Sequence, residues 1–192
     1  MTYIIDNFLT EDEYKITEQQ IIKHFPDLTL FKRNDDLKYS TFEFDEYYIN
    51  NREEQPIFNI FHDKIWSDNT NRLIENNEDL TWKLFNLRNT YVMTLRSWYG
   101  NGYDWHYDIN CTYDMSSWSG QIAAFIWYYK PKDSYTGGDL EIEKYGKIEP
   151  KDNRLVLLSA THKHKIHDTV MKDGYDLKGI NGRVTIMGSI FM

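Results

Sequence analysis

The sequence is poor in cysteine, in long apolar runs and in positive charge, and each shortage excludes a class of protein. Its single cysteine, Cys111, excludes a disulfide framework and a cysteine-rich zinc site. No apolar run approaches the roughly 18 residues that a membrane-spanning helix needs. The N-terminus is acidic and lacks the basic and apolar regions of a signal peptide. We therefore expect a cytoplasmic protein.

Acidic residues outnumber basic ones, 30 against 22, and the 192-residue chain has a net charge of −8. A general nucleic-acid binder needs a positive surface for phosphates, so a nucleic-acid partner is not expected. Aromatic residues make up 16% of the sequence, whereas disordered chains are poor in them. The length suits a single domain whose core needs no disulfide or metal to hold it together. We expect residues 1–192 to form one such domain.

Two helices are predicted in the N-terminal part of the chain. Thr10 followed by Glu13 is typical of a capping box, and Pro26 ends the helix that this box begins. Pro56 suits the first turn of a second helix. Residues 1–80 are therefore expected to form a mainly helical supporting layer.

Residues 81–192 contain short strands separated by turns. Glycine and asparagine mark the turns, and no helical pattern lies between the strands. Such a pattern indicates an antiparallel double sheet, so we expect an α+β, mainly β fold. The predicted strands are Tyr91–Tyr99, Gln121–Tyr129, Leu140–Glu143, Arg154–Leu158 and Arg183–Phe191.

Several residues have the chemistry of metal ligands. His106 and Asp108 are two positions apart, so on a strand they would share one face and could bind one ion, although a polar surface strand gives the same pattern. His162, His164 and His167 follow an apolar strand, and one of them could reach the same cavity unless the whole run is a solvated basic stretch. Two histidines and one carboxylate form the facial triad of non-haem Fe(II) oxygenases.

Arg183 opens the last predicted strand. Burying a guanidinium without a partner is costly, so an arginine on a core strand needs an anion beside it. One of the acidic side chains could be that anion, or the arginine could extend to the rim of the sheet. The functional interpretation is a bidentate clamp on the carboxylate of a ligand.

Taken in order, these motifs resemble the prolyl-4-hydroxylase-like Fe(II)/2-oxoglutarate dioxygenases over the C-terminal half of the chain. The resemblance is strongest to the hypoxia-sensing prolyl hydroxylases. It implies a double-stranded β-helix, or jelly-roll, core. The shared pieces besides the His-x-Asp motif are Tyr99–Gly102, Ile126–Tyr128, Gly137–Gly138, Ile148–Lys151 and Arg154–Leu155.

The resemblance implies a role for each matching histidine and carboxylate. His106 and Asp108 would be the first two Fe(II) ligands. The third ligand would be His164, because His164-Lys165-Ile166 fits the family's His-x-Val pattern. His167 and then His162 are the alternatives for this position.

The resemblance also implies a cosubstrate site. Arg183 would bind the distal carboxylate of 2-oxoglutarate, with Tyr128 and, more loosely, Tyr99 as hydrogen-bond donors. Arg183 lies 19 positions beyond His164, which is further than is usual in the family, and residues 171–180 look like an insertion. Oxygen would be the second cosubstrate and ascorbate the reductant.

Aromatic residues near these motifs are the main indication of a substrate. We expect most of them to be core residues, with an aromatic groove for a peptide or proline ring as the functional alternative. The segment Asn110–Gly120 could be a lid or a plain connection. The aromatic residues concerned are Trp98, Tyr103, Trp105, Trp118, Trp127 and Tyr129.

The resemblance thus implies hydroxylation of an unactivated C–H bond, most simply in peptidyl proline or another amino-acid side chain, with conversion of 2-oxoglutarate to succinate. A β domain that binds a partner without catalysis is one alternative. An oxygenase acting on a small metabolite or a nucleobase is another. The oligomeric state is left open by the sequence.

Overall fold

The computed structural model describes residues 2–33, 37–44, 55–65, 91–98, 100, 102–108, 121–176 and 178–191. Its helical elements belong to the N-terminal part of the chain. No helix among these residues is long and apolar enough to cross a bilayer. The helical elements are α1 (Glu11–His24), the 3-10 helix η1 (Phe25–Asp27) and α3 (Pro56–Ile65).

Helix α1 begins and ends where the sequence predicts. The Thr10 hydroxyl accepts from the Glu13 backbone N–H at 3.4 Å, and the Glu13 carboxylate accepts from the Thr10 N–H at 2.7 Å. This reciprocal capping satisfies two backbone donors at the start of the helix. The α-helix ends at His24, two residues before Pro26, and α3 begins at Pro56.

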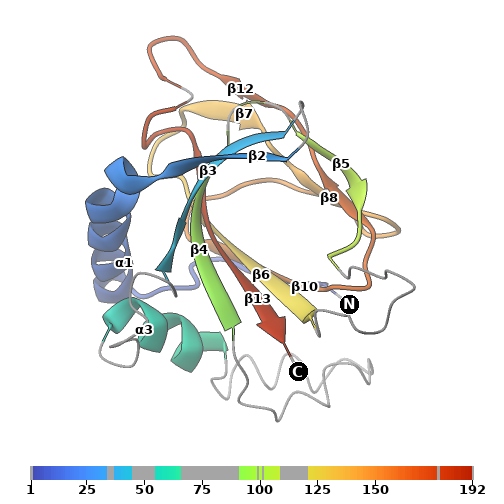
Figure 1. Cartoon of the computed structure of the whole chain (residues 1–192), viewed down its shortest axis with the longest axis horizontal. Coiled ribbons are helices and arrows are strands. Elements are labelled where there is room, and N and C mark those ends of the chain that lie inside the picture. The colour runs from blue at the N-terminus through green and yellow to red at the C-terminus, as the bar shows by residue number, and fades with distance from the viewer. Residues whose placement is uncertain are drawn as a thin grey trace.

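The larger of the two main sheets has seven antiparallel strands and runs through the centre of the molecule (Figure 1). Strand β13 lies in its middle, between β6 and β4, and makes the longest pairings. In spatial order the strands are β1 (Thr2–Ile5), β10 (Arg154–Ser159), β6 (Gln121–Tyr129), β13 (Arg183–Phe191), β4 (Tyr91–Trp98), β3 (Leu37–Glu43) and β2 (Thr29–Arg33).

A smaller four-stranded sheet packs against one face of the larger sheet. Its strands are β5 (Tyr103–His106), β11 (His164–Ile166), β8 (Leu140–Ile142) and β9 (Gly146–Ile148), in that order. A third, two-stranded sheet pairs β12 (Thr169–Met171) with β7 (Tyr135–Gly137). The antiparallel double-sheet core is the jelly roll that the sequence predicts, and the fold class is confirmed.

Successive side chains of the central strands point to opposite faces of the large sheet, and the interior therefore has two separate hydrophobic cores. Phe125 and Trp127 of β6 belong to the core that the helices cover, together with Phe61 of α3. Ile126 and Tyr128 point the other way, into the core between the two main sheets. Figure 1 shows α1 and α3 on one side of the large sheet and β5 and β8 on the other.

The N-terminal part of the chain contributes strands to the large sheet in addition to the expected helices. Strand β1 pairs with β10, and the β2–β3 hairpin extends the large sheet by pairing β3 with β4. These pairings join segments far apart in sequence, and long-range pairing of this kind outweighs local preference. The N-terminal part therefore supplies three strands of the large sheet as well as helices.

Candidate metal centre

Strand pairing brings two histidines face to face. In the antiparallel pairing of β5 with β11, His106 and His164 are direct partners. Directly opposed residues have their side chains on the same face of a sheet, a few ångströms apart. Their ring centroids are 4.2 Å apart, and His164 is buried.

Asp108 joins this pair from beyond the end of β5. The strand stops at His106, so the carboxylate does not share a strand face with His106 as the sequence analysis assumed. It still reaches the pair: Asp108 Oδ1 lies 3.8 Å from His106 Nε2 and 3.6 Å from His164 Nε2. All three potential ligand atoms lie within 4.8 Å of one another. Donors that each lie about 2.1 Å from one transition-metal ion are about 3–4 Å apart, so this spacing fits a shared ion.

Both imidazoles are oriented by the backbone. Nδ1 of His106 lies 2.8 Å from the carbonyl oxygen of Asp104, and Nδ1 of His164 lies 2.9 Å from that of His162. A carbonyl oxygen only accepts, so each Nδ1 is the protonated nitrogen. Each Nε2 then carries its lone pair on the side facing Asp108, as metal-ligating histidines require.

The other two histidines of the cluster lie elsewhere. The His162 ring packs 5.2 Å from the Tyr145 ring. His167 Nε2 lies 2.6 Å from a carboxylate oxygen of Glu141. Of the three histidines considered for the third ligand, the structure brings only His164 together with His106 and Asp108; that these bind iron stays a prediction.

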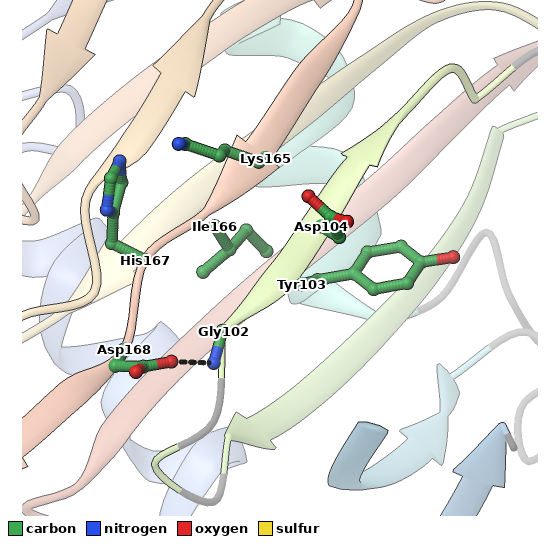
Figure 2. A pocket seen from close by; sticks show the side chains of 7 residues that line it. All are labelled: Gly102, Tyr103, Asp104, Lys165, Ile166, His167 and Asp168. Atoms are coloured by element: carbon green, nitrogen blue, oxygen red, sulfur yellow. Dashed lines mark hydrogen bonds between the residues drawn. The ribbon is translucent and has the colours of Figure 1, made fainter. Parts of the chain in front are cut away.

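A groove of about 310 Å³ lies on the outer face of the small sheet, between β11 and the turn before β5 (Figure 2). Lys165 and His167 line it, and they alternate along the chain with the inward-facing His164. In Figure 2 the Asp168 carboxylate points at the Gly102 amide, from which it accepts a hydrogen bond at 2.6 Å. The groove is therefore separate from the three candidate ligands, and the Asp168 contact fixes the turn that leads into β5.

Arg183 is fully buried at the start of β13. Its Nε donates to the Gly138 carbonyl oxygen at 3.0 Å. Its guanidinium carbon lies 5.1 Å from the Trp98 ring centroid and 5.5 Å from that of Tyr128. Within the part of the chain that the structure describes, neither Nη1 nor Nη2 has a hydrogen-bond partner. A buried guanidinium with both ends open has the donor pattern that binds a carboxylate.

The Tyr128 hydroxyl lies beside this guanidinium and is also fully buried. No hydrogen bond of normal geometry reaches it from the described residues. Burial raises the pKa of Tyr128, and the Arg183 charge opposes that rise. The hydroxyl is therefore protonated and able to donate. Tyr99, the third residue predicted for this site, lies outside the described residues, as do the candidate lid Asn110–Gly120 and Cys111.

Most of the described aromatic residues near the site are core residues, as expected. Trp127 and Tyr129 face the helices, where the Trp127 indole donates to Asn153 at 3.1 Å and the Tyr129 hydroxyl to Glu18 at 2.7 Å. Trp98 and Tyr103 pack in the core between the sheets. These four side chains are thus occupied in packing, and Trp118 lies outside the described residues.

Gly138 is not among the site residues predicted from the sequence. With φ at +72°, it approaches Arg183 so closely that an added Cβ would lie 2.8 Å from Arg183 Cδ and 2.9 Å from Thr169 Oγ1. Glycine readily adopts positive φ and leaves room for the arginine. The Gly137–Gly138 pair is the sequence feature that could have pointed to this contact. A pair of glycines alone indicates only a turn, and its role here depends on the position of Arg183.

Comparison with known proteins agrees with this geometry. A family model described as the 2OG-Fe(II) oxygenase superfamily matches residues 92–188. The match covers half of the chain, so the protein belongs to this superfamily and is an Fe(II)- and 2-oxoglutarate-dependent dioxygenase. No curated protein sequence matches the chain.

Solved structures of prolyl hydroxylases share the fold. A Trichoplax adhaerens prolyl hydroxylase bound to a hypoxia-inducible-factor peptide is 17% identical, with a TM-score of 0.64 over 99% of this chain and 83% of that one. A Pseudomonas putida prolyl-4-hydroxylase is 12% identical, with a TM-score of 0.64 over 99% and 91%. A viral collagen prolyl hydroxylase from Paramecium Bursaria Chlorella virus-1 is 16% identical, with a TM-score of 0.58 over 98% and 94%. The resemblance to prolyl hydroxylases seen in the motifs thus extends to the fold.

Proposed function

We propose that this protein hydroxylates an unactivated C–H bond in peptidyl proline or another amino-acid side chain. One observation carries the proposal: the candidate ligands and a buried arginine with two open nitrogens lie on different sheets around one core. Ile166, which shares a strand face with His164, belongs to the same core as Tyr128, which neighbours Arg183. The two ends of an oxo acid could therefore be bound from the two sheets.

In this proposal His106, Asp108 and His164 hold Fe(II). The set fits the metal, because two imidazoles and one carboxylate are the donors of the facial triad and leave positions open. The hydrogen bonds from both Nδ1 atoms hold the rings in the ligating orientation before metal arrives. Little rearrangement of these rings is then needed on binding.

Arg183 and Tyr128 bind the distal carboxylate of 2-oxoglutarate. The two open guanidinium nitrogens can donate in parallel to both carboxylate oxygens, and the Tyr128 hydroxyl adds a third donor. The Gly138 carbonyl holds the other side of the guanidinium, so the open nitrogens keep one direction. Burial strengthens these charge-assisted bonds because water does not compete for them.

Fe(II) held by His106, Asp108 and His164 would supply activation of dioxygen, of which one oxygen atom would enter succinate as carbon dioxide leaves and the other would enter the C–H bond of the acceptor. The protein's own residues orient the oxo acid and exclude water from it. Similarity of fold to prolyl hydroxylases, one of them bound to a peptide, supports a peptide acceptor.

The experiment is succinate production from 2-oxoglutarate with Fe(II), ascorbate and air, first without an added acceptor. Wild type should form succinate slowly, Asp108→Ala should form none, and Asp173→Ala, which removes an exposed carboxylate, should match wild type. Proline-containing peptides should then raise the rate more than free amino acids do.

Two results would count against the proposal. Formation of equal amounts of succinate by wild type and Asp108→Ala would show that Asp108 is not a metal ligand. No succinate, together with no anaerobic binding of 2-oxoglutarate to the Fe(II)-loaded protein, would favour a β domain that binds a partner without catalysis. Stimulation by free metabolites alone would favour a small-molecule acceptor.

A further inference from the structure

Tyr135 of β7 is a buried tyrosine whose hydroxyl makes no hydrogen bond to the residues that the structure describes. The residue has no exposed surface, and its hydroxyl meets no hydrogen-bond partner among the described residues. Burying a hydroxyl without a partner costs free energy, and a phenylalanine would fill the same space without that cost. A buried donor of this kind indicates a partner that the protein chain itself does not provide.

The segment that directly follows the strand of Tyr135 contacts the Arg183 side chain. Gly138, three residues further on, accepts from Arg183 Nε and packs against its side chain. Thr169 of β12 pairs with Gly137 of β7, and its hydroxyl packs against the same point. The β7–β12 sheet therefore lies against the guanidinium, and Tyr135 enters the interior from this sheet.

The pKa of the Tyr135 hydroxyl also depends on Arg183 and Tyr128. Burial raises the pKa of Tyr135, the nearby Arg183 charge opposes the rise, and Tyr128 and Asp152 add to it. The Lys130 ammonium lies 4.3 Å from the centroid of the Tyr135 ring.

Four buried polar atoms without a hydrogen-bond partner in the described part of the chain thus belong to three neighbouring residues: Nη1 and Nη2 of Arg183 and the hydroxyls of Tyr128 and Tyr135. All four can donate, and the only charge among them is positive. Such a set is complementary to a carboxylate, whose two oxygens together accept about four hydrogen bonds.

We propose that Tyr135 is a positioning residue for 2-oxoglutarate, donating from its hydroxyl to the distal carboxylate beside Arg183 and Tyr128. The inference rests on the proposed function of this site. It gives the β7–β12 sheet a part in binding the cosubstrate, because this sheet supplies the fourth donor.

The test compares Tyr135→Phe with wild type and with Tyr175→Phe, a control on a more exposed tyrosine. Dissociation constants of 2-oxoglutarate and of 2-oxobutanoate, which lacks the distal carboxylate, are measured anaerobically on the Fe(II)-loaded proteins by calorimetry. Tyr135→Phe should weaken 2-oxoglutarate binding about tenfold, or about 1.4 kcal/mol, as expected for one hydrogen bond to a charged group. It should leave 2-oxobutanoate binding unchanged, and Tyr175→Phe should change neither constant.

A second measurement separates this role from a structural one. Without ligand, the melting temperature of Tyr135→Phe should equal or exceed that of wild type, because the variant removes a buried hydroxyl that has no partner. Equal weakening of both acids, no weakening of 2-oxoglutarate, or a lower melting temperature of the ligand-free variant would each overturn the inference. If wild type itself fails to bind 2-oxoglutarate, the proposed function fails and this inference with it.

Discussion

His106 and His164 each donate from Nδ1 to the carbonyl two residues earlier in the chain. The same local bond at two places gives both rings the same tautomer, although they come from segments far apart in the sequence. The same bonds distinguish His164 from the other two histidines of the cluster as a candidate ligand. His162 contributes its backbone carbonyl to the bond with His164, and the His167 ring contacts Glu141. Residue types and spacing suggest candidates, and the hydrogen-bonding pattern distinguishes among them.

Gly138 gives a prediction at the scale of one residue. Gly138→Ala places a Cβ against Arg183 and Thr169 in a backbone with φ at +72°, so the guanidinium must shift. We expect 2-oxoglutarate binding to weaken at least about tenfold, since bidentate bonds depend on geometry. Calorimetric titration of the Fe(II)-loaded variant measures the effect.

Gly146→Ala is the matched control for this variant. Gly146 also has a positive φ, +92°, but an added Cβ there meets nothing within 4 Å. Both variants carry a backbone cost of about 1 kcal/mol, and only Gly138→Ala disturbs the arginine. Equal binding of 2-oxoglutarate by the two variants would show that Gly138 does not position Arg183.

At the scale of elements, the contact between the end of α1 and β3 is aromatic. His24, the last residue of α1, is buried and stacks on Phe42 of β3 with ring centroids 4.3 Å apart. The Phe44 ring meets it edge-on at 5.8 Å. Burial lowers the pKa of His24 and Lys23 lowers it further, while Asp27 acts in the opposite direction.

This contact predicts a dependence of stability on pH. Because the pKa of His24 is lower in the folded state than the unfolded value of about 6.5, the unfolded chain binds more protons below that pH. The stabilisation is complete above about pH 6.5 and is lost as the pH falls. Urea unfolding in EDTA at pH 7.5 and 5.5 should show a smaller loss for His24→Gln than for wild type. Equal losses in the two proteins would refute the prediction.

Elements whose own sequence carries a signal were predicted well, including the strands β4, β6 and β13, and elements without such a signal were missed. The Thr10–Glu13 capping box and Pro56 define the starts of α1 and α3 through contacts within a few residues. Strands β2 and β3 carry no comparable signal, and β3 is held by a pairing in which Thr41 lies opposite Arg96. The β7–β12 pairing is equally non-local, which is why Tyr135 was not recognised.

At the scale of the whole molecule, the candidate site could be predicted in its residue types but not in its geometry. Spacing and resemblance indicate His106, Asp108, His164 and Arg183 as candidates. They do not reveal that His106 and His164 are direct strand partners, because register depends on the complete sheet. They also do not reveal that Arg183 lacks an acidic partner among the described residues, because that depends on every neighbouring side chain.

Metal binding should stabilise the whole fold. A metal that binds the native protein and not the unfolded chain adds about 2.7 kcal/mol at a hundredfold excess over its dissociation constant. For a chain of this size, that corresponds to a rise in melting temperature of about 5–10 °C. Anaerobic thermal melts with Fe(II) alone should show this rise for wild type and Asp173→Ala but not for Asp108→Ala. The same rise in Asp108→Ala would mean that the metal binds elsewhere.

The candidate metal ligands belong to the small sheet or the segment that follows β5, whereas Arg183 and Tyr128 belong to the large sheet. The length of an oxo diacid that is bound at both ends would therefore have to match the separation of the two sheets. Side chains that are strand partners of none of these residues, such as Ile148 and Val156 in the core between the sheets, contribute to that separation. Changing their size would alter which carbon-chain length the protein prefers without touching any group that contacts the acid.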